Sequence, residues 1–394
     1  MQKAVVILGG ARTPMADYCG QFKDMSATEL ATIAAKAALE RSGTRPDEID
    51  HTVMGNVMQA GSDAIYASRH VALRAGVPID RPALTVNRLC GSGIQSIVTG
   101  AQMIQLGEAQ RVLAGGMESM SQAPFVVPGA RWGLRLGSAQ IVDMLMASLF
   151  DPYCGLYMAQ TAEKVAGKYG VTREDQDVFA ALSHSRAAQA QAAGKHKEEI
   201  QPVEIKTKKG VEQFATDDHI KPDTSPEVLA KLKPAFGKDG SVTGGNASGI
   251  VDAGAAVVIA DESAARNSQK TPLGRIVSWG IAGVDPSEMG MGPVPATKQA
   301  LAKAGLKLTD IDLIELNEAF AAQYLGVEKE LELDREKTNV NGGAIALGHP
   351  LGATGTRLVL TLLLELRRRK KKYGLATACI GGGQGIAIIV ESYN

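Results

Sequence analysis

Short apolar runs alternate along the chain with longer segments whose apolar residues recur at helical spacing. Residues 26–43 show that spacing, open on a capping Ser26 and stop at Gly43, so they are predicted to form a helix. Strands are predicted from the runs "KAVVIL", "AAVVIA", "RIVSWGIAG", "IDLIEL", "ATACI" and "GIAIIVES". Alternation of this kind indicates an α/β fold in which helices cover a largely buried sheet.

The second half of the chain echoes the first. Residues 47–57, "DEIDHTVMGNV", resemble residues 309–319, "TDIDLIELNEA". "TVNRLCGSG" around Cys90 is matched by "NVNGGAIALGHPLGATG" around His349, and "RVLAGGMES" is matched by "ATACIGGGQG". Because these segments come in the same order in both halves, we predict a duplication that brings equivalent loops together.

Residues 119–240 break the repeated pattern. They hold a helical stretch, "TREDQDVFAALSHSRAAQAQAAGKHKEE", and a segment rich in lysine and proline. We interpret them as an inserted loop domain that covers a site. The first unit then comprises residues 1–118 plus about 241–268, and the second unit comprises residues 269–394.

Composition excludes several classes of function. The 394 residues are 45% hydrophobic and 21% charged, with a formal net charge of zero. This balance suits a globular protein and offers no basic excess for nucleic acid or an anionic membrane surface. The four cysteines are widely spaced, and neither CxxC nor HExxH occurs, so we expect reduced thiols and no metal site. Without a convincing signal peptide or an apolar run of bilayer length, a cytoplasmic enzyme is expected.

Cys90 is the first candidate for chemistry, because it precedes a predicted helix that begins after Gly91. Unpaired N–H groups and the dipole at a helix N-terminus stabilise an anion, so we expect a lowered thiol pKa and a nucleophilic Cys90. Gly91 and Gly93 are expected to leave room for a substrate to approach the sulfur. The alternative is a small buried hydrophobic residue, which is a common state of free cysteines.

Three further residues end strands or occupy turns. His349 lies between Gly348 and Pro350, in a turn that can point its ring into a cleft; the alternative is a loop histidine bonded to its own backbone. Cys379 opens "CIGGGQG", but a strand rather than a helix follows, so a dinucleotide site is not favoured and an acid or base remains. Asn317 can donate to an oxyanion or, with Glu318, can cap the next helix.

Together these segments resemble the thiolase family, and specifically its biosynthetic, short-chain acetyl-CoA acetyltransferases. The resemblance covers essentially the whole chain through "NRLCGSGIQSI", "GGMESMSQAP", "NEAFAAQ", "NVNGGAIALGHPLGATG" and "CIGGGQGIA", in the order of the family. It implies two βαβαβαββ halves in a five-layered αβαβα arrangement with an inserted loop domain. It also implies a homotetramer that is a dimer of dimers, with residues 125–147 as the contact between dimers.

The resemblance implies a role for each matching residue. Cys90 would be the nucleophile activated by His349, and Cys379 would be the acid or base. Asn317 (through a water) and His349 would form one oxyanion hole, and the N–H groups of Cys90 and Gly381 the other. Coenzyme A and acetyl-CoA would be substrates, with no tightly bound cofactor. The residues implied to contact them are Ser248, Lys221, Tyr157, Met158, Met289, Ala319 and Phe320.

The leading interpretation is an acetyl-CoA C-acetyltransferase that condenses two acetyl-CoA reversibly to acetoacetyl-CoA and CoA through an acetyl-Cys90 intermediate. The alternative is a broader 3-ketoacyl-CoA thiolase of fatty-acid degradation. A protein that binds acyl-CoA without catalysis is disfavoured by the intact Cys90, Asn317, His349 and Cys379. Tyr157 stands where short-chain members commonly have histidine, which leaves the acyl chain length open.

Overall fold

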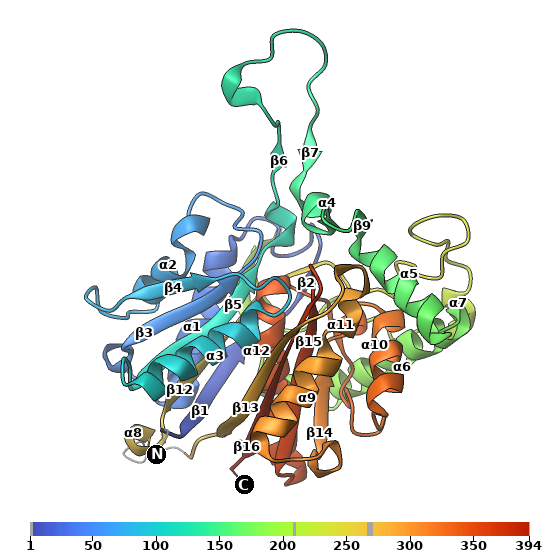
Figure 1. Cartoon of the computed structure of the whole chain (residues 1–394). Coiled ribbons are helices and arrows are strands. Elements are labelled where there is room, and N and C mark those ends of the chain that lie inside the picture. The colour runs from blue at the N-terminus through green and yellow to red at the C-terminus, as the bar shows by residue number, and fades with distance from the viewer. Residues whose placement is uncertain (1–2, 208–209, 266–270, 394) are drawn as a thin grey trace.

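The computed structural model describes residues 3–207, 210–265 and 271–393. Within them a ten-stranded sheet follows the order β14-β15-β16-β13-β1-β12-β5-β3-β4, with the short β2 paired to β12 (Figure 1). Its strands are β1 (Val5–Arg12), β2 (Ala16–Asp17), β3 (His51–Asn56), β4 (Ala83–Val86), β5 (Arg111–Glu118), β12 (Val251–Asp261), β13 (Gly274–Gly283), β14 (Leu313–Leu316), β15 (Tyr373–Ile380) and β16 (Gln384–Ser392). All six strands predicted from apolar runs are present.

The order of the strands reveals the duplication. One half of the sheet runs β1-β12-β5-β3-β4, and the other runs β13-β16-β15-β14. Each half contains a parallel pair, β3 with β5 or β14 with β15, and the return strand that follows, β12 or β16, is antiparallel. Within the described residues, the sheet is continuous between the halves through the pairs Val6–Arg275 and Ile7–Gly274. The predicted repeat is therefore confirmed in the layout of the sheet.

Two aspartates at equivalent positions of the two halves make equivalent hydrogen bonds. Asp50 accepts the backbone N–H groups of residues 110–111, where β5 begins, at 2.8 and 3.1 Å. Asp312 accepts those of residues 372–373, where β15 begins, at 3.0 and 2.9 Å. Both belong to the echoed segments "DEID" and "TDID", so this sequence similarity has a structural cause.

Helices form three layers around the two halves of the sheet. Helices α1 (Ala27–Ser42) and α2 (Ala67–Arg74) cover the outer face of the first half, and α9 (Pro293–Ala304) and α10 (Ala321–Leu331) cover that of the second. Helices α3 (Ser92–Leu106) and α12 (Leu351–Arg369) lie between the halves within a shared apolar core. The result is the five-layered αβαβα arrangement.

The predicted ends of the first helix are correct. Ser26 caps α1 through a capping box, and Gly43 ends it in a left-handed conformation. Helix α12 begins at Leu351, and the N–H groups of residues 353–354 in its first turn donate to the Pro350 carbonyl. Among the described residues, no helix is both long and apolar enough to cross a membrane.

The segment between β5 and β12 lies outside the main sheet. It contains the hairpin β6 (Phe125–Val126) and β7 (Val142–Asp143), which stands out from the body of the molecule (Figure 1). The remaining elements here are α4 (Met144–Ser148), β8 (Phe150–Asp151), β9 (Leu156–Tyr157), α5 (Met158–Tyr169), α6 (Arg173–Ala192), β10 (Val203–Thr207), β11 (Gly210–Phe214) and α7 (Pro226–Leu229). Helices α8 (Glu262–Ala265) and α11 (Ala344–Leu347) lie in the two halves. The predicted boundary at 268/269 falls outside the described residues, and the domain limits stay a prediction.

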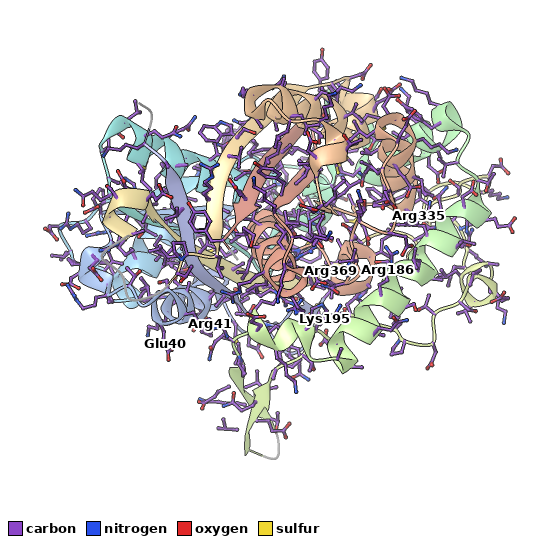
Figure 2. The ribbon with its side chains drawn as sticks, turned by 90° about the horizontal axis from the view of Figure 1, so that it is seen from below. Glu40, Arg41, Arg186, Lys195, Arg335 and Arg369 are labelled. Atoms are coloured by element: carbon purple, nitrogen blue, oxygen red, sulfur yellow. The ribbon has the colours of Figure 1, made fainter. Side chains whose placement is uncertain are left out.

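Ion pairs and hydrogen bonds of charged side chains connect this segment to the two halves. Arg12 of β1 is fully buried and pairs with Glu199 and Asp217, each at 2.7 Å. On the underside shown in Figure 2, Arg186 of α6 donates to the Arg335 carbonyl at 2.9 Å. The buried Arg12 contacts stabilise the attachment of the segment, because a buried charge that loses its partner is costly.

Candidate active site

Cys90 lies in a tight turn between β4 and α3. Leu89, just before it, has a φ of 44°, a left-handed conformation that non-glycine residues seldom adopt outside constrained functional turns. The N–H of Gly91 bonds the Arg88 carbonyl at 2.9 Å, and α3 begins at Ser92. The predicted position of Cys90 at a helix N-terminus is therefore confirmed.

The two glycines beside Cys90 have a different purpose from the one expected. A Cβ on Gly91 would lie 2.5 Å from Ile380 Cδ1, and one on Gly93 would lie 2.4 Å from the backbone N of Thr356. Both glycines therefore make room for the second half of the molecule, and not for a substrate. They let α3 approach α12 and β15 closely, which brings the two echoed loops together.

The electrostatics of Cys90 also correct an expectation. Burial raises the pKa of the thiol to about 11, and a negative charge on Glu118 acts in the same direction. The backbone N–H groups of Gly381 and of Cys90 itself act in the opposite direction and lower the pKa without overcoming this rise. The free protein therefore holds Cys90 as a thiol, because desolvation outweighs the helix N-terminus. A base must take its proton before it can attack.

Cys379 lies at the end of β15 and is fully buried. It packs in one apolar cluster with Met289, Ala319, Met158 and Phe320. Burial, together with the neighbouring Cys90, holds the pKa of the Cys379 thiol well above its usual value. The segments that carry the two thiols, one from each half of the duplication, are in contact: a Cβ on Gly91 would lie 2.5 Å from Ile380 Cδ1, and one on Gly381 would lie 3.3 Å from Leu89 Cδ1.

His349 is a buried, neutral base in the same region. Burial, and then the charge of Arg357, lower its pKa to about 3. Its Nδ1 lies 2.7 Å from Thr354 Oγ1, whose own hydroxyl donates to the Pro350 carbonyl at 3.0 Å. Nδ1 must therefore be the donor, which leaves Nε2 as a proton acceptor. The alternative of a histidine bonded to its own backbone is not what the side chain does.

Asn317 follows β14 and lies against the histidine. Its Nδ2 donates to His349 Nε2 at 3.4 Å, while its buried Oδ1 has no hydrogen-bond partner within the described part of the chain. The helix-cap alternative is wrong, because α10 begins only at Ala321 after Phe320. Glu318 instead accepts from Ser183 Oγ and other buried donors.

An apolar cavity of about 240 Å³ opens beside these residues. Four of the predicted substrate contacts line it together with His349: Tyr157, Met158, Ser248 and Phe320. Met289 and Ala319 lie with Cys379 in the adjoining cluster. Lys221 is not among the lining residues; its backbone N–H bonds His184 Nδ1 at 3.1 Å.

Sequence reasoning missed much of the wall of this cavity. The largest of the missed lining residues are Met120, Met146, Leu149, Phe236, Ile250 and Leu351. Most come from the inserted segment, where no periodic pattern marks them. Tyr157 stacks on Phe236 at 5.1 Å between ring centres and contacts Phe150 at 5.0 Å. The tyrosine at this position is therefore fixed in an aromatic cluster.

Comparison with known proteins agrees with this architecture. The models of the thiolase N-terminal and C-terminal domains match residues 5–263 and 270–392. A human mitochondrial 3-ketoacyl-CoA thiolase is 54% identical, covering 99% of this chain and 98% of the relative, and an acetyl-CoA acetyltransferase of Syntrophomonas wolfei is 47% identical over the full length of both. A crystal structure of human mitochondrial 3-ketoacyl-CoA thiolase in complex with CoA superposes with a TM-score of 0.97 and 52% identity, covering 99% and 98% of the chains. The chain therefore belongs to the thiolase family of acyltransferases.

Proposed function

We propose that the protein catalyses the reversible thiolytic cleavage of 3-ketoacyl-CoA esters, with acetoacetyl-CoA and its formation from two acetyl-CoA within its range. The observation that carries this proposal is the meeting of two thiols and a neutral imidazole. Cys90 and Cys379 interact electrostatically, and His349, whose unprotonated Nε2 accepts a long hydrogen bond from Asn317, lines the cavity. A reaction that needs a nucleophile and a separate acid or base suits this pair.

In the cleavage direction, Cys90 Sγ attacks the 3-keto carbon while its proton passes to His349 Nε2. The bond between C2 and C3 of the substrate then breaks, and its electron pair stays on C2 of the departing acetyl-CoA. Cys379 gives its proton to that carbon. The acyl group is now a thioester on Cys90.

A second step returns the enzyme to its starting state. The thiol of coenzyme A attacks the acyl-Cys90 carbonyl and loses its proton to the Cys379 thiolate. The Cys90 sulfur leaves and regains its proton from His349. In the reverse direction, acetyl-Cys90 forms first, and the Cys379 thiolate removes a C2 proton from the second acetyl-CoA.

The oxyanions of these steps have donors ready. We assign the N–H groups of Cys90 and Gly381 to the oxygen of the thioester on Cys90, since both lower the pKa of Cys90 and so favour negative charge at this place. Asn317 and protonated His349 are assigned to the oxygen of the departing acetyl-CoA enolate. Ser248 and Met158 then border the pantetheine arm, and Lys221 is proposed near the nucleotide, outside the described cavity.

Chain length separates the two candidate functions. The cavity is walled by Met146, Leu149, Tyr157 and Phe236 in addition to the residues around the thiols, which favours an acyl chain longer than that of acetoacetyl-CoA. The identity of 54% to a relative named 3-ketoacyl-CoA thiolase points the same way, against 47% to one named acetyl-CoA acetyltransferase. The narrower acetyltransferase remains the second candidate.

Substrate kinetics test this choice. We expect kcat/KM to be about 30-fold higher for 3-ketohexanoyl-CoA than for acetoacetyl-CoA, because two added methylenes buried in an apolar wall contribute about 1 kcal/mol each. Measuring thiolysis of a series from four to ten carbons checks it. A clear maximum at acetoacetyl-CoA would favour the acetyltransferase, and an absence of thiolysis with every substrate would refute both.

We also propose a homotetramer in which the β6–β7 hairpin pairs two dimers. Its loop exposes Trp132, Leu134, Leu136 and Ile141, with 79%, 63%, 101% and 68% of their surfaces accessible. Apolar side chains gathered on a protruding hairpin are typical of an interface. The hairpin lies away from the thiols, so assembly and chemistry can be tested separately.

The variant Leu134→Asp is expected to convert tetramers to dimers while kcat changes by less than about twofold, because a charge in an apolar interface costs several kcal/mol. Analytical ultracentrifugation measures the assembly. The matched control is Val211→Asp on the β10–β11 hairpin, which has the same 63% exposure and should remain tetrameric. A wild-type dimer, or a tetrameric Leu134→Asp variant, would contradict the proposed contact.

The cytoplasm is our proposed compartment, and it rests on the sequence alone. The human relative is named mitochondrial, which makes the compartment a question for experiment. Fractionation of the source cells with an antibody to the native protein decides it.

A further inference from the structure

Glu118 ends β5 and is almost completely buried, with 1% of its surface exposed. Each carboxylate oxygen accepts two N–H donors. Oε1 accepts from Asn56 Nδ2 at 3.0 Å and from the Met58 N–H at 3.1 Å. Oε2 accepts from the N–H groups of Val57 at 3.2 Å and Gly352 at 2.9 Å. Four donors saturate the ionised form, whereas a protonated acid would set its own hydrogen against one of them.

These donors connect the two reacting groups of the proposed function. Gly352 lies in the first turn of α12, three residues after His349, so its bond to Glu118 places a negative charge at the N-terminus of that helix. Val57 and Met58 pack in the same apolar cluster as Cys90 and Leu351. The Glu118 carboxylate thus bonds both the helix start next to His349 and the two residues that pack in the cluster of Cys90.

The backbone segments around Glu118 are in close contact with one another. A Cβ on Gly352 would lie 2.4 Å from the Met117 carbonyl and 2.8 Å from the Gly55 carbonyl. The start of α12 therefore rests directly on the ends of β3 and β5. Removing the carboxylate would leave four buried N–H groups without their acceptor, and the helix start would have to move.

We propose that Glu118 is a positioning residue, whose ionised carboxylate holds the start of α12 so that His349 faces Cys90. The inference rests on the proposed function and adds a residue that touches neither the substrate nor the reacting atoms. The negative charge of Glu118 also has an unfavourable effect, because it raises the pKa of the Cys90 thiol. In this proposal, the gain from holding His349 in place outweighs that repulsion.

The charge of Glu118 also links the site to pH. Burial raises its pKa to about 7 despite the N–H donors, and Asp252 of β12 acts in the same direction. The ionisable groups that face it are thus Asp252 and Cys90, whose pKa values are also raised. As the pH falls through about 7, Glu118 takes up a proton and loses acceptor capacity. The positioned state, and with it kcat, should decline below that pH.

The test compares Glu118→Gln with the wild type and with Asp50→Asn. Asp50 is a matched control, because its carboxylate also accepts backbone N–H groups of β5 but at the opposite end of the strand. We expect Glu118→Gln to lose about 10- to 100-fold in kcat with KM for the acyl-CoA changed by less than about threefold, since a displacement of about 1 Å costs that much. Its kcat should also lose the decline below about pH 7. Asp50→Asn should have a lower Tm but keep both kcat and the pH profile.

Other outcomes would overturn the proposal. These are a kcat of Glu118→Gln within about twofold of the wild type, a loss confined to KM, or an equal loss of kcat in Asp50→Asn. Should Glu118→Gln not fold, Glu118→Asp takes its place, because a side chain one methylene shorter keeps the charge but releases Gly352; an unchanged kcat there is equally contrary. Wild-type thiolysis is measured first, so failure of the proposed function is seen independently.

Discussion

The variant Cys90→Ala is expected to lose thiolysis and condensation by at least about 10⁴-fold. Removing a nucleophile eliminates the covalent intermediate itself, and such losses in other enzymes reach about 10⁶-fold. The variant should remain folded, because alanine fills most of the space that the Cys90 side chain occupies in the cluster of Met120, Leu145 and Leu351. Steady-state thiolysis of acetoacetyl-CoA gives the first measurement, and mass spectrometry after incubation with acetyl-CoA gives the second. The wild type should gain one acetyl group at Cys90.

Cys154→Ala is the matched control for this experiment. Cys154 is also a partly buried free thiol, but it lies in the inserted segment, where its sulfur contacts the Asp151 carbonyl at 3.9 Å. It should retain kcat within about twofold and should still be acetylated at Cys90. If Cys90→Ala kept its activity, or if the acetyl group appeared on another residue, the mechanism would be wrong.

The second large effect is expected at Cys379. Cys379→Ala should lower kcat by about 10³-fold, since general acid–base catalysis contributes about 10²- to 10⁴-fold. Acetylation of Cys90 by acetyl-CoA should be slowed much less, because there Cys379 only protonates the sulfur of the departing coenzyme A, which can leave as a thiolate, whereas condensation needs Cys379 to remove a proton from carbon. The variant therefore separates the two thiols, with a covalent intermediate that forms but does not go on to condense.

Cys379→Ser tests whether the loss is chemical. Serine nearly preserves the volume of the fully buried side chain, yet its hydroxyl is far too weak an acid to shuttle a proton near neutral pH. It should therefore be as inactive as the alanine variant, with a somewhat lower Tm because its hydroxyl is buried in an apolar cluster. A serine variant with near wild-type kcat would show that Cys379 only fills space.

Much of the fold could be predicted because it rests on local patterns. The apolar runs became strands, the capping pair Ser26 and Gly43 bounds α1, and the echoed segments occupy equivalent places in the two halves. Cys90, His349, Cys379 and Asn317 could be singled out for similar reasons, because each lies at a strand end or turn that the chain marks with glycine, proline or a polar residue.

Other features depend on contacts between residues that are distant in the sequence. The pKa of Cys90 was expected to fall because the helix N-terminus is a local feature, but it rises because burial is a tertiary one. Gly91 and Gly93 were assigned to the substrate, whereas they admit the second half of the molecule. The cavity wall came from an inserted segment without periodicity, so no pattern could have identified Phe236 or Leu149.

The sequence by itself determined the duplicated α/β architecture, the order of its elements and the residue types that can perform the chemistry, because propensity, capping and apolar spacing act between near neighbours in the chain. Only the tertiary structure decided which of those residues meet and in which protonation state. The neutral tautomer of His349, the raised pKa of both thiols and the hydrogen bond between Gly352 and Glu118 depend on groups that are distant in sequence. These groups are buried together in one region from which water is excluded. Desolvation and hydrogen-bond saturation are properties of that space, and no stretch of sequence carries them alone.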